Sequence, residues 1–178
     1  MSPFVQHTFA TMIDRLIKNN HLPFDDHQST RFYMYNERVI RFFHSQTLDL
    51  VRQALGKPVK PSYVYFGGYV PGAGLTPHTD RPACEYTLSL LVDQSPAGTT
   101  WSLGIKRESL EIGPNNVGGS ASWPAAKDTV WAEQQPGDGF LILGRKKIHF
   151  RDGKLPEGMY TRAYFLHYVN EDFTGEIV

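Results

Sequence analysis

The sequence predicts a mainly β protein whose first third is helical. After Pro61, short runs rich in aromatic and β-branched residues alternate with turns that contain Gly and Pro, whereas apolar residues before Gly56 recur at helical spacing. Because no helical periodicity separates the later runs, they favour an antiparallel sandwich or a small barrel. The length of 178 residues fits one domain, with a helical part at 1–58 and a β core at 61–170.

Two segments carry the helical pattern. In residues 5–19, apolar side chains recur every three or four positions, which predicts a helix with one buried face: Phe9, Met12, Ile13, Leu16 and Ile17. Residues 29–55 carry a similar stripe, and Gly56 with Pro58 ends it. We therefore expect a second helix over 29–55.

The β part begins with the aromatic run at 63–66 and continues with TLSLLV, FLIL and AYFLHYV at 87–92, 140–143 and 163–169. Residues 93–129 are the least regular, and we expect mostly long loops there, with strands near 101–106 and 109–112. Long loops on a β scaffold often line a binding site.

Charge and composition exclude several classes of function. Eighteen Lys plus Arg balance eighteen Asp plus Glu, so no overall field favours nucleic acid or an anionic membrane as partner. No apolar run is long enough to span a bilayer. Cys84 is the single cysteine and cannot form an internal disulfide, which favours a reducing, cytoplasmic location.

The residues with the strongest chemical signal are His78 and Asp80, which are two positions apart and would share one face of an extended chain. His149, after the run FLIL, is a candidate third ligand, and Arg162 opens the terminal strand thirteen residues later. Two histidines and a carboxylate leave other metal positions open, which suits ferrous iron that binds a chelating cosubstrate and dioxygen. Arg162 could form a bidentate pair with a dicarboxylate.

The stretches GGYVPGAGLTPHTDRPACEYTLSLLVD and PGDGFLILGRKKIHF, with the strand from Arg162, resemble the iron(II)- and 2-oxoglutarate-dependent oxygenases, in particular their prolyl-4-hydroxylase-like branch. The resemblance covers roughly 61–169. It implies a double-stranded β-helix, which is a jelly-roll or cupin-like barrel, with the N-terminal helices on one outer face. It also implies that His78, Asp80 and His149 bind the metal, that Arg162 binds the distal carboxylate of 2-oxoglutarate, and that Tyr69 lies near this cosubstrate.

Two features keep alternatives open. Many relatives have Ser or Thr two residues after the arginine, where this chain has Tyr164, and Arg151 is a rival for the same salt bridge. We prefer Arg162 because its spacing and its place at a strand start fit the resemblance better. Tyr63, Tyr65 and Tyr69 share parity and could all face the barrel interior.

The hypothesis is an oxidoreductase, a dioxygenase that uses iron(II), 2-oxoglutarate and dioxygen to hydroxylate an unactivated C–H bond of a small molecule, amino acid or peptide. Asp80 favours hydroxylation over halogenation, because related halogenases replace this carboxylate. Desaturation or ring formation would use the same ligands. The alternatives are a cupin-like metalloenzyme that does not use 2-oxoglutarate and a non-catalytic β-barrel binding module. The oligomeric state is left open.

The other polar candidates receive simpler interpretations. We expect His7, His21 and His27 at the surface and His44 packed or solvated within a helix. His167 falls on the opposite strand face from Arg162 and is expected to be a hydrogen-bonded packing residue. Arg81 would meet either an anionic substrate or an ion-pair partner, and Cys84 is interpreted as a small apolar filler.

Overall fold

A computed structural model describes residues 1–25, 29–113 and 117–177, and it contains two antiparallel β-sheets with three helices. The main sheet has the order β1 (Phe24–Asp25), β2 (Arg31–Tyr35), β3 (Val59–Tyr69), β11 (Tyr160–Asn170), β5 (Tyr86–Ser95) and β9 (Gly139–Ile142). The second sheet has the order β7 (Gly119–Ser120), β4 (His78–Thr79), β10 (His149–Arg151), β6 (Leu103–Lys106) and β8 (Thr129–Ala132). Two short 3-10 helices complete the elements, at Pro82–Cys84 and Ala126–Asp128.

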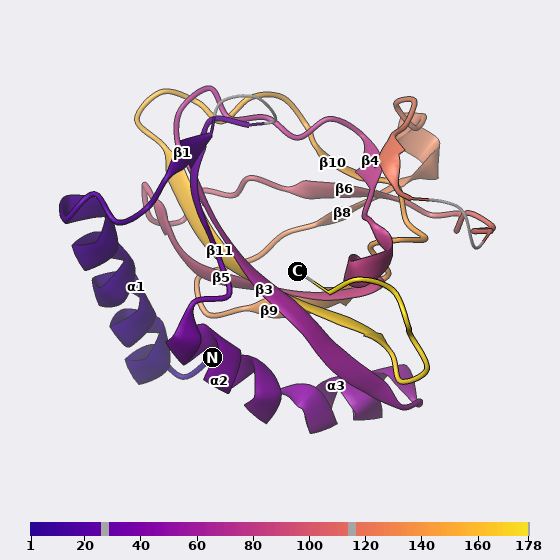
Figure 1. The fold of residues 1–178 in the computed structure, drawn as a ribbon. Helices are drawn as coiled ribbons and strands as arrows, with labels where there is room; N and C mark the ends of the chain where they lie inside the picture. The colour runs from indigo at the N-terminus through magenta and orange to yellow at the C-terminus, as the bar shows by residue number, and fades with distance from the viewer. Residues whose placement is uncertain (26–28, 114–116, 178) are drawn as a thin grey trace.

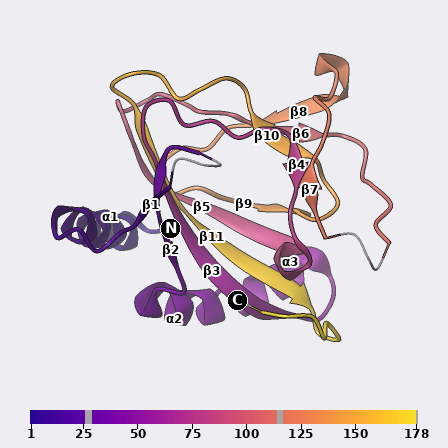
Figure 2. The same cartoon turned by 45° about the horizontal axis from the view of Figure 1, so that its top comes forward.

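The helices cover one face of the main sheet, and the second sheet lies across its other face (Figures 1 and 2). Helix α1 (Pro3–Lys18) contacts β5, whereas α2 (Arg38–Gln46) and α3 (Leu48–Leu55) contact β3. The layered arrangement therefore separates an apolar core under the helices from a space between the two sheets.

Helix α1 confirms the expected first helix. Ser2 caps its N-terminus by accepting a hydrogen bond from the backbone of Val5, and Pro3 occupies the first turn, where its missing N–H costs nothing. Phe9 and Ile13 are its buried residues. They pack into the main core, where Phe9 makes edge contacts with the rings of Phe43 and Tyr164.

The second predicted helix is wrong over its first part. Residues 31–35 form β2, which pairs with β3 along its length, and helical structure begins only at Arg38. The sequence Arg-Phe-Tyr-Met-Tyr is rich in β-forming side chains, and a neighbouring strand is available to satisfy its backbone. Phe32 and Met34 contact the main core, whereas Tyr33 packs with Tyr65 in the other cluster, which is the alternation typical of a strand.

The predicted strands at 63–66, 87–92, 140–143 and 163–169 are confirmed as parts of β3, β5, β9 and β11. Strand β6 confirms the one near 101–106. The strand predicted at 109–112 is wrong, because this segment has no ladder and Leu110 instead donates one isolated backbone hydrogen bond to Lys146. None of the described helices combines the length and the apolar character needed to cross a bilayer.

The two faces of strand β11 contact different parts of the protein. Tyr164, Leu166 and Tyr168 are almost completely buried in the core beneath the helices. Phe165 and His167, which alternate with them, line the space between the sheets. Both faces of this strand are therefore covered, one by apolar packing and the other by a cavity wall.

Candidate metal centre

A cavity of about 690 Å³ lies between the two sheets. Its wall combines tyrosines from β2 and β3 with histidines and arginines from β2, β4, β10, β11 and the segment after β4. A volume of this order is typical of small-molecule sites, which fall at roughly 300–1,000 Å³.

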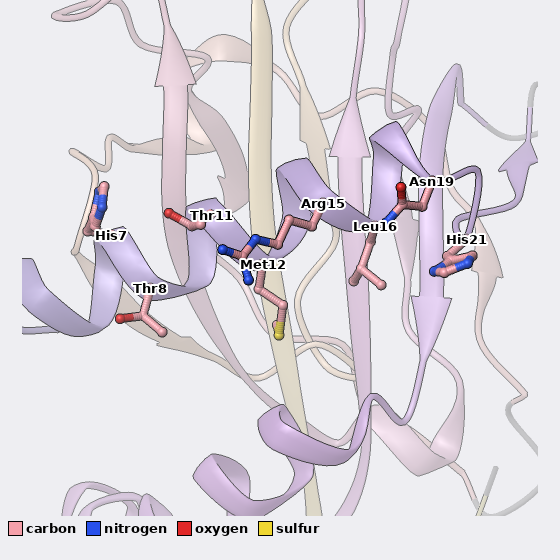
Figure 3. A pocket seen from close by; sticks show the side chains of 8 residues that line it. All are labelled: His7, Thr8, Thr11, Met12, Arg15, Leu16, Asn19 and His21. Carbon is pink, nitrogen blue, oxygen red and sulfur yellow. The ribbon is translucent and has the colours of Figure 1, made fainter.

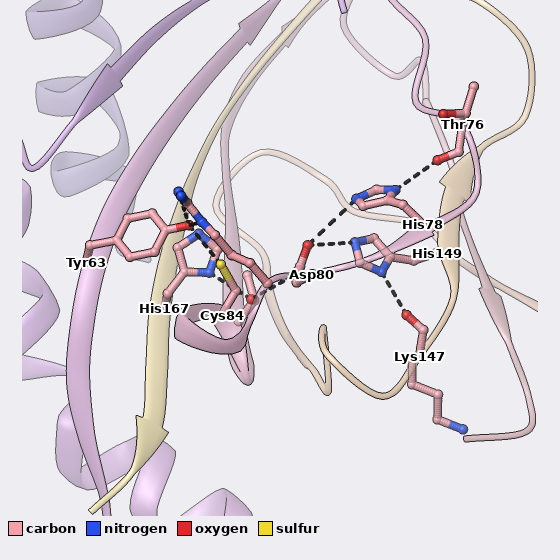
Figure 4. Close-up of polar contacts among 10 residues, drawn as sticks. Tyr63, Thr76, His78, Asp80, Cys84, Lys147, His149 and His167 are labelled. Atoms are coloured by element: carbon pink, nitrogen blue, oxygen red, sulfur yellow. Dashed lines mark hydrogen bonds and ion pairs between the residues drawn. The ribbon is translucent and has the colours of Figure 1, made fainter. Parts of the chain in front are cut away.

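Three predicted ligands meet in this cavity. His78 Nε2 lies 3.7 Å and His149 Nε2 3.5 Å from the same Asp80 oxygen, Oδ1 (Figure 4). A ligand atom from each side chain falls within 4.8 Å of the others. We call these three residues the His–Asp–His triad. Strands β4 and β10 bring the imidazoles together, because His78 and His149 are directly paired across the ladder.

Backbone carbonyls orient both imidazoles. His78 Nδ1 lies 2.8 Å from the carbonyl oxygen of Thr76, and His149 Nδ1 lies 2.9 Å from that of Lys147. Because a carbonyl oxygen only accepts, each Nδ1 must carry the proton, and in the neutral ring the Nε2 lone pair remains available. Each histidine uses the carbonyl two residues before it, so the local chain fixes the tautomer that a metal ligand needs.

The electrostatics keep Asp80 ionised. Burial raises the pKa of this carboxyl group, but the neighbouring imidazoles of His149, His167 and His78, and a hydrogen bond that His149 donates through Nε2 when it is protonated, lower it more, to about 2. Burial and the neighbouring His149 lower the pKa of His78, whereas the pKa of His149 is raised because Asp80 outweighs its burial. A cation placed among these groups would meet an anionic oxygen and two imidazole nitrogens.

Gly144 makes room for the carboxylate. A Cβ atom at this position would collide with Asp80 Oδ2 and lie 3.0 Å from the backbone oxygen of Cys84. The Gly144 carbonyl also accepts a 2.9 Å hydrogen bond from the Asp80 backbone N–H. The glycine that follows the run FLIL therefore holds Asp80 against the strand end that leads to His149.

A second group, Asp80, Cys84 and His167, also brings three ligand atoms within 4.8 Å of one another. Burial raises the pKa of the Cys84 thiol to about 12, so it is protonated at neutral pH and is a poor ligand. His167 Nδ1 lies 2.9 Å from Thr87 Oγ1 and is engaged there. This placement agrees with the expected packing role of His167, and the His–Asp–His triad is the better candidate of the two groups to hold a metal ion.

The structure does not bring Arg162 to the cavity, which corrects its expected position. Its guanidinium points to the helix side, where it donates to Asp93 Oδ1 at 2.6 Å and to Asp14 Oδ1 at 2.5 Å. The cause is strand parity. Arg162 shares its face of β11 with Tyr164 and Leu166, which belong to the core beneath the helices.

Arg151, the rival of Arg162, does line the cavity. It lies two residues beyond His149 on β10, so both side chains share one face. Its guanidinium stacks over Trp101 at 4.8 Å, and burial lowers its pKa to about 10, which still leaves it charged at neutral pH. Among the described residues, no carboxylate forms an ion pair with it.

Tyr63, Tyr65 and Tyr69 all line the cavity, as their shared parity predicts. Gly67 lies between Tyr65 and Tyr69 on the same strand face, and a Cβ atom there would lie 2.9 Å from the ring of Tyr69. The absence of a side chain at this position therefore makes room for that ring. The sequence interpretation missed Arg31, which also lines the cavity, stands over the rings of Tyr65 and Tyr69, and pairs with Asp25 at 3.5 Å. The strand periodicity of residues 31–35 was the signal that could have found it.

Of the remaining histidines, those that the structure describes do not form a site. His7 and His21 lie at opposite ends of the group of side chains that lines a second pocket along α1, so their rings do not converge (Figure 3). His44 is buried and makes an edge contact with Tyr168 at 4.5 Å between ring centroids. His27 lies outside the described residues.

Compared by sequence, the chain matches no protein-family model and no curated protein. Compared by structure, it is similar to the α-ketoglutarate-dependent epimerase SnoN from nogalamycin biosynthesis, with a TM-score of 0.69 and 12% identity over 96% of this chain and 75% of that one. A Pseudomonas putida prolyl-4-hydroxylase gives a TM-score of 0.68 and 13% identity, over 96% and 89% of the two chains. HygX from Streptomyces hygroscopicus, with nickel, 2-oxoglutarate and hygromycin B bound, gives 0.64 and 14%, over 98% and 81%.

These similarities confirm the predicted fold. The chain has the double-stranded β-helix of the iron- and 2-oxoglutarate-dependent oxygenases, and N-terminal helices cover one face of the main sheet. At this level of identity the likeness concerns the fold, and these neighbours include an epimerase as well as a hydroxylase. The function must therefore be argued from the site.

Proposed function

We propose that the protein is an iron(II)- and 2-oxoglutarate-dependent oxygenase that hydroxylates a C–H bond of a small molecule. The observation that carries this proposal is the His–Asp–His triad at the wall of a cavity between the two sheets, with a charged arginine, Arg151, two residues beyond one ligand. Two histidines and one carboxylate with open positions form the ligand set typical of non-haem ferrous oxygenases.

In this proposal His78 and His149 bind the metal through Nε2, and Asp80 binds it through Oδ1. The carbonyls of Thr76 and Lys147 hold the Nδ1 protons, which keeps both rings in the ligating tautomer. When bound, iron and 2-oxoglutarate supply the oxidising power for the reaction by activating dioxygen. The protein's own groups bind, orient and exclude water.

We assign the distal carboxylate of 2-oxoglutarate to Arg151 in place of Arg162. Arg151 shares the strand face of His149, lines the cavity and has no carboxylate partner among the described residues, whereas two carboxylates already hold Arg162. A charged guanidinium in a largely buried site is stabilised by a bidentate carboxylate. Tyr69 and Arg151 both contact Trp101. The Tyr69 ring makes an edge contact with Trp101 at 5.3 Å, and the Arg151 guanidinium stacks over the same residue at 4.8 Å.

The cavity supports a small-molecule substrate more than a peptide. A volume of about 690 Å³ between two sheets must hold both cosubstrate and substrate, which leaves room for a compact ligand. Two of the structural neighbours also support a small molecule, because SnoN was solved with nogalamycin RO bound and HygX with hygromycin B bound. We keep a free amino acid within this proposal and place a peptide behind it.

The test measures metal, cosubstrate and turnover in turn. Purified wild-type protein should bind about one ferrous ion per chain, His78→Ala should lose it, and His21→Ala, at the surface just beyond the end of α1, should retain it. Bound iron should then permit 2-oxoglutarate binding and, with air and a substrate panel, the formation of succinate.

Each failure selects an alternative. Metal binding without 2-oxoglutarate binding would support the cupin-like metalloenzyme. The absence of stoichiometric metal in wild type would support the non-catalytic binding module.

A further inference from the structure

The cavity carries more positive charge than the proposed cofactors use. Among the described lining residues, Arg31, Arg81 and Arg151 are cationic and Asp80 is the acid. Arg31 pairs with Asp25 outside the lining, and the two charges of a ferrous ion match those of 2-oxoglutarate. Asp80 then balances Arg151, so the described lining residues offer no counter-charge to Arg81, which is exposed at the cavity wall.

Arg81 is held in place by tyrosine rather than by an acid. Its Nε and Nη2 donate to the hydroxyl oxygen of Tyr63 at 3.0 and 2.8 Å, and its guanidinium lies 4.8 Å from the centre of that ring. Because the two N–H groups use both lone pairs of this oxygen, the Tyr63 hydroxyl hydrogen is directed to Cys84 Sγ, 2.8 Å away. Cys84 also lies within hydrogen-bonding reach of the guanidinium. No ion pair joins Arg81 to a carboxylate of the described residues. The hydrogen bonds to Tyr63 use Nε and Nη2, and the Arg81 side chain is exposed, so its Nη1 edge can reach a ligand.

The backbone that carries Arg81 is also fixed. Gly118, with φ of +80°, packs so closely on the peptide between Asp80 and Arg81 that a Cβ there would lie 2.6 Å from the Asp80 carbonyl carbon and 2.9 Å from the Arg81 nitrogen. Arg81 directly follows a ligand of the His–Asp–His triad in sequence. Arg81 and the triad line the same cavity, so an anion bound to Arg81 would share that cavity with the metal, on the side where Figure 4 shows Tyr63 and Cys84.

Aromatic rings continue the wall next to Arg81. The guanidinium lies 5.9 Å from the ring centre of Tyr35, which makes an edge contact with Tyr65 at 4.9 Å. Phe165 follows, with its ring 6.2 Å from Tyr65. Such a wall suits a flat apolar body next to the anionic group.

We infer that Arg81 is the specificity-determining residue for an anionic substrate, a small organic molecule that carries a carboxylate or phosphate next to a flat apolar body. This inference rests on the proposed function, because the cosubstrate must already occupy Arg151. Arg81 binds the anion through its Nη1 edge, Tyr63 holds the guanidinium in position, and the tyrosine wall contacts the body of the substrate.

The test is anaerobic calorimetry on protein loaded with nickel(II) and saturating 2-oxoglutarate. The probes are benzoate, phenyl phosphate and the neutral benzamide. We expect wild type to bind at least one anion roughly tenfold or more tightly than benzamide, the effect of about one charge-assisted hydrogen bond. The favoured anion distinguishes a carboxylate substrate from a phosphate. Arg81→Gln should bring the ratio to near one, and Arg81→Lys should retain part of it.

The matched control is Arg38→Gln, which removes an exposed charge from α2 and should keep the wild-type ratio. Equal binding of all three probes to loaded wild type, or an unchanged ratio in Arg81→Gln, would overturn the inference and leave the proposed function intact. Failure of wild type to bind nickel and 2-oxoglutarate would overturn the proposed function and the inference with it. Thermal unfolding of each variant shows that it is folded.

Discussion

Replacement of Arg151 by Gln is the sharpest test of how the cavity binds its cosubstrate. The variant keeps a polar side chain of similar reach but removes the charge, which no carboxylate of the described residues offsets in the free protein. The His–Asp–His triad is untouched, so the affinity for iron should remain close to that of wild type. The affinity for 2-oxoglutarate should fall.

The magnitude follows from the geometry. A bidentate carboxylate pair comprises two charge-assisted hydrogen bonds, each worth about 1.5–3 kcal/mol. Gln can restore one neutral bond, so a net loss of about 3 kcal/mol is expected, which is a rise of roughly 10²-fold in Kd. Arg162→Gln should leave this Kd unchanged, because its guanidinium is bound to Asp14 and Asp93 on the other face of the sheet.

The assay is a titration of 2-oxoglutarate into anaerobic, iron-loaded protein, followed by calorimetry or by the visible absorption of the chelate. A large loss in Arg162→Gln with a near-normal Kd in Arg151→Gln would refute the reasoning. It would mean that β11 presents its other face to the cosubstrate.

Three further predictions concern the supports of the site. Gly144→Ala should weaken iron binding by at least roughly tenfold in equilibrium dialysis, because the new Cβ would displace the Asp80 carboxylate; unchanged affinity would contradict the role given to this glycine. Phe9→Ala should lower the free energy of unfolding by about 3–5 kcal/mol in urea while iron affinity persists, since the ring is buried on the helix side. For His44, burial lowers the pKa from 6.5 to about 4, so its contribution to stability is complete above pH 6.5 and is lost as the pH falls towards 4. Between pH 8 and pH 5, the free energy of unfolding measured in urea should therefore fall by about 2 kcal/mol less in His44→Gln than in wild type. An equal fall in the two proteins would show that His44 is not the cause of this pH dependence.

The sequence was sufficient where the chemistry is local or the pattern is strong. His78 and Asp80 are two residues apart, and the turn and strand around them identify the segment. The strands from 87 and from 163 have runs that no helix would favour. His149 could be proposed because it follows a strand and a glycine break, but its pairing with His78 comes from a ladder between distant segments that only the fold sets.

The sequence could not predict which face of a strand lines the cavity. On β11 both faces are buried, so alternation separates Arg162 from His167 correctly but does not say which of them faces the cavity. The sequence predicts a helix over 31–35 because Phe32 continues the apolar stripe of the helix that follows. The pairing of this segment with β3 overrides that pattern and places Arg31 in the cavity.

The two arginines that compete for the cosubstrate show how this fold separates stability from function. Arg162 joins α1 to the main sheet through Asp14 and Asp93, and loss of this partly buried pair should cost about 2–4 kcal/mol of unfolding free energy. Arg151 has no such partner among the described residues, so its replacement should leave stability unchanged or improve it. An unpaired buried charge can destabilise the free protein and still be needed to bind a ligand. If Arg151 binds the cosubstrate, replacing it should lower the affinity for 2-oxoglutarate without loss of stability, whereas replacing Arg162 should lower stability without loss of this affinity.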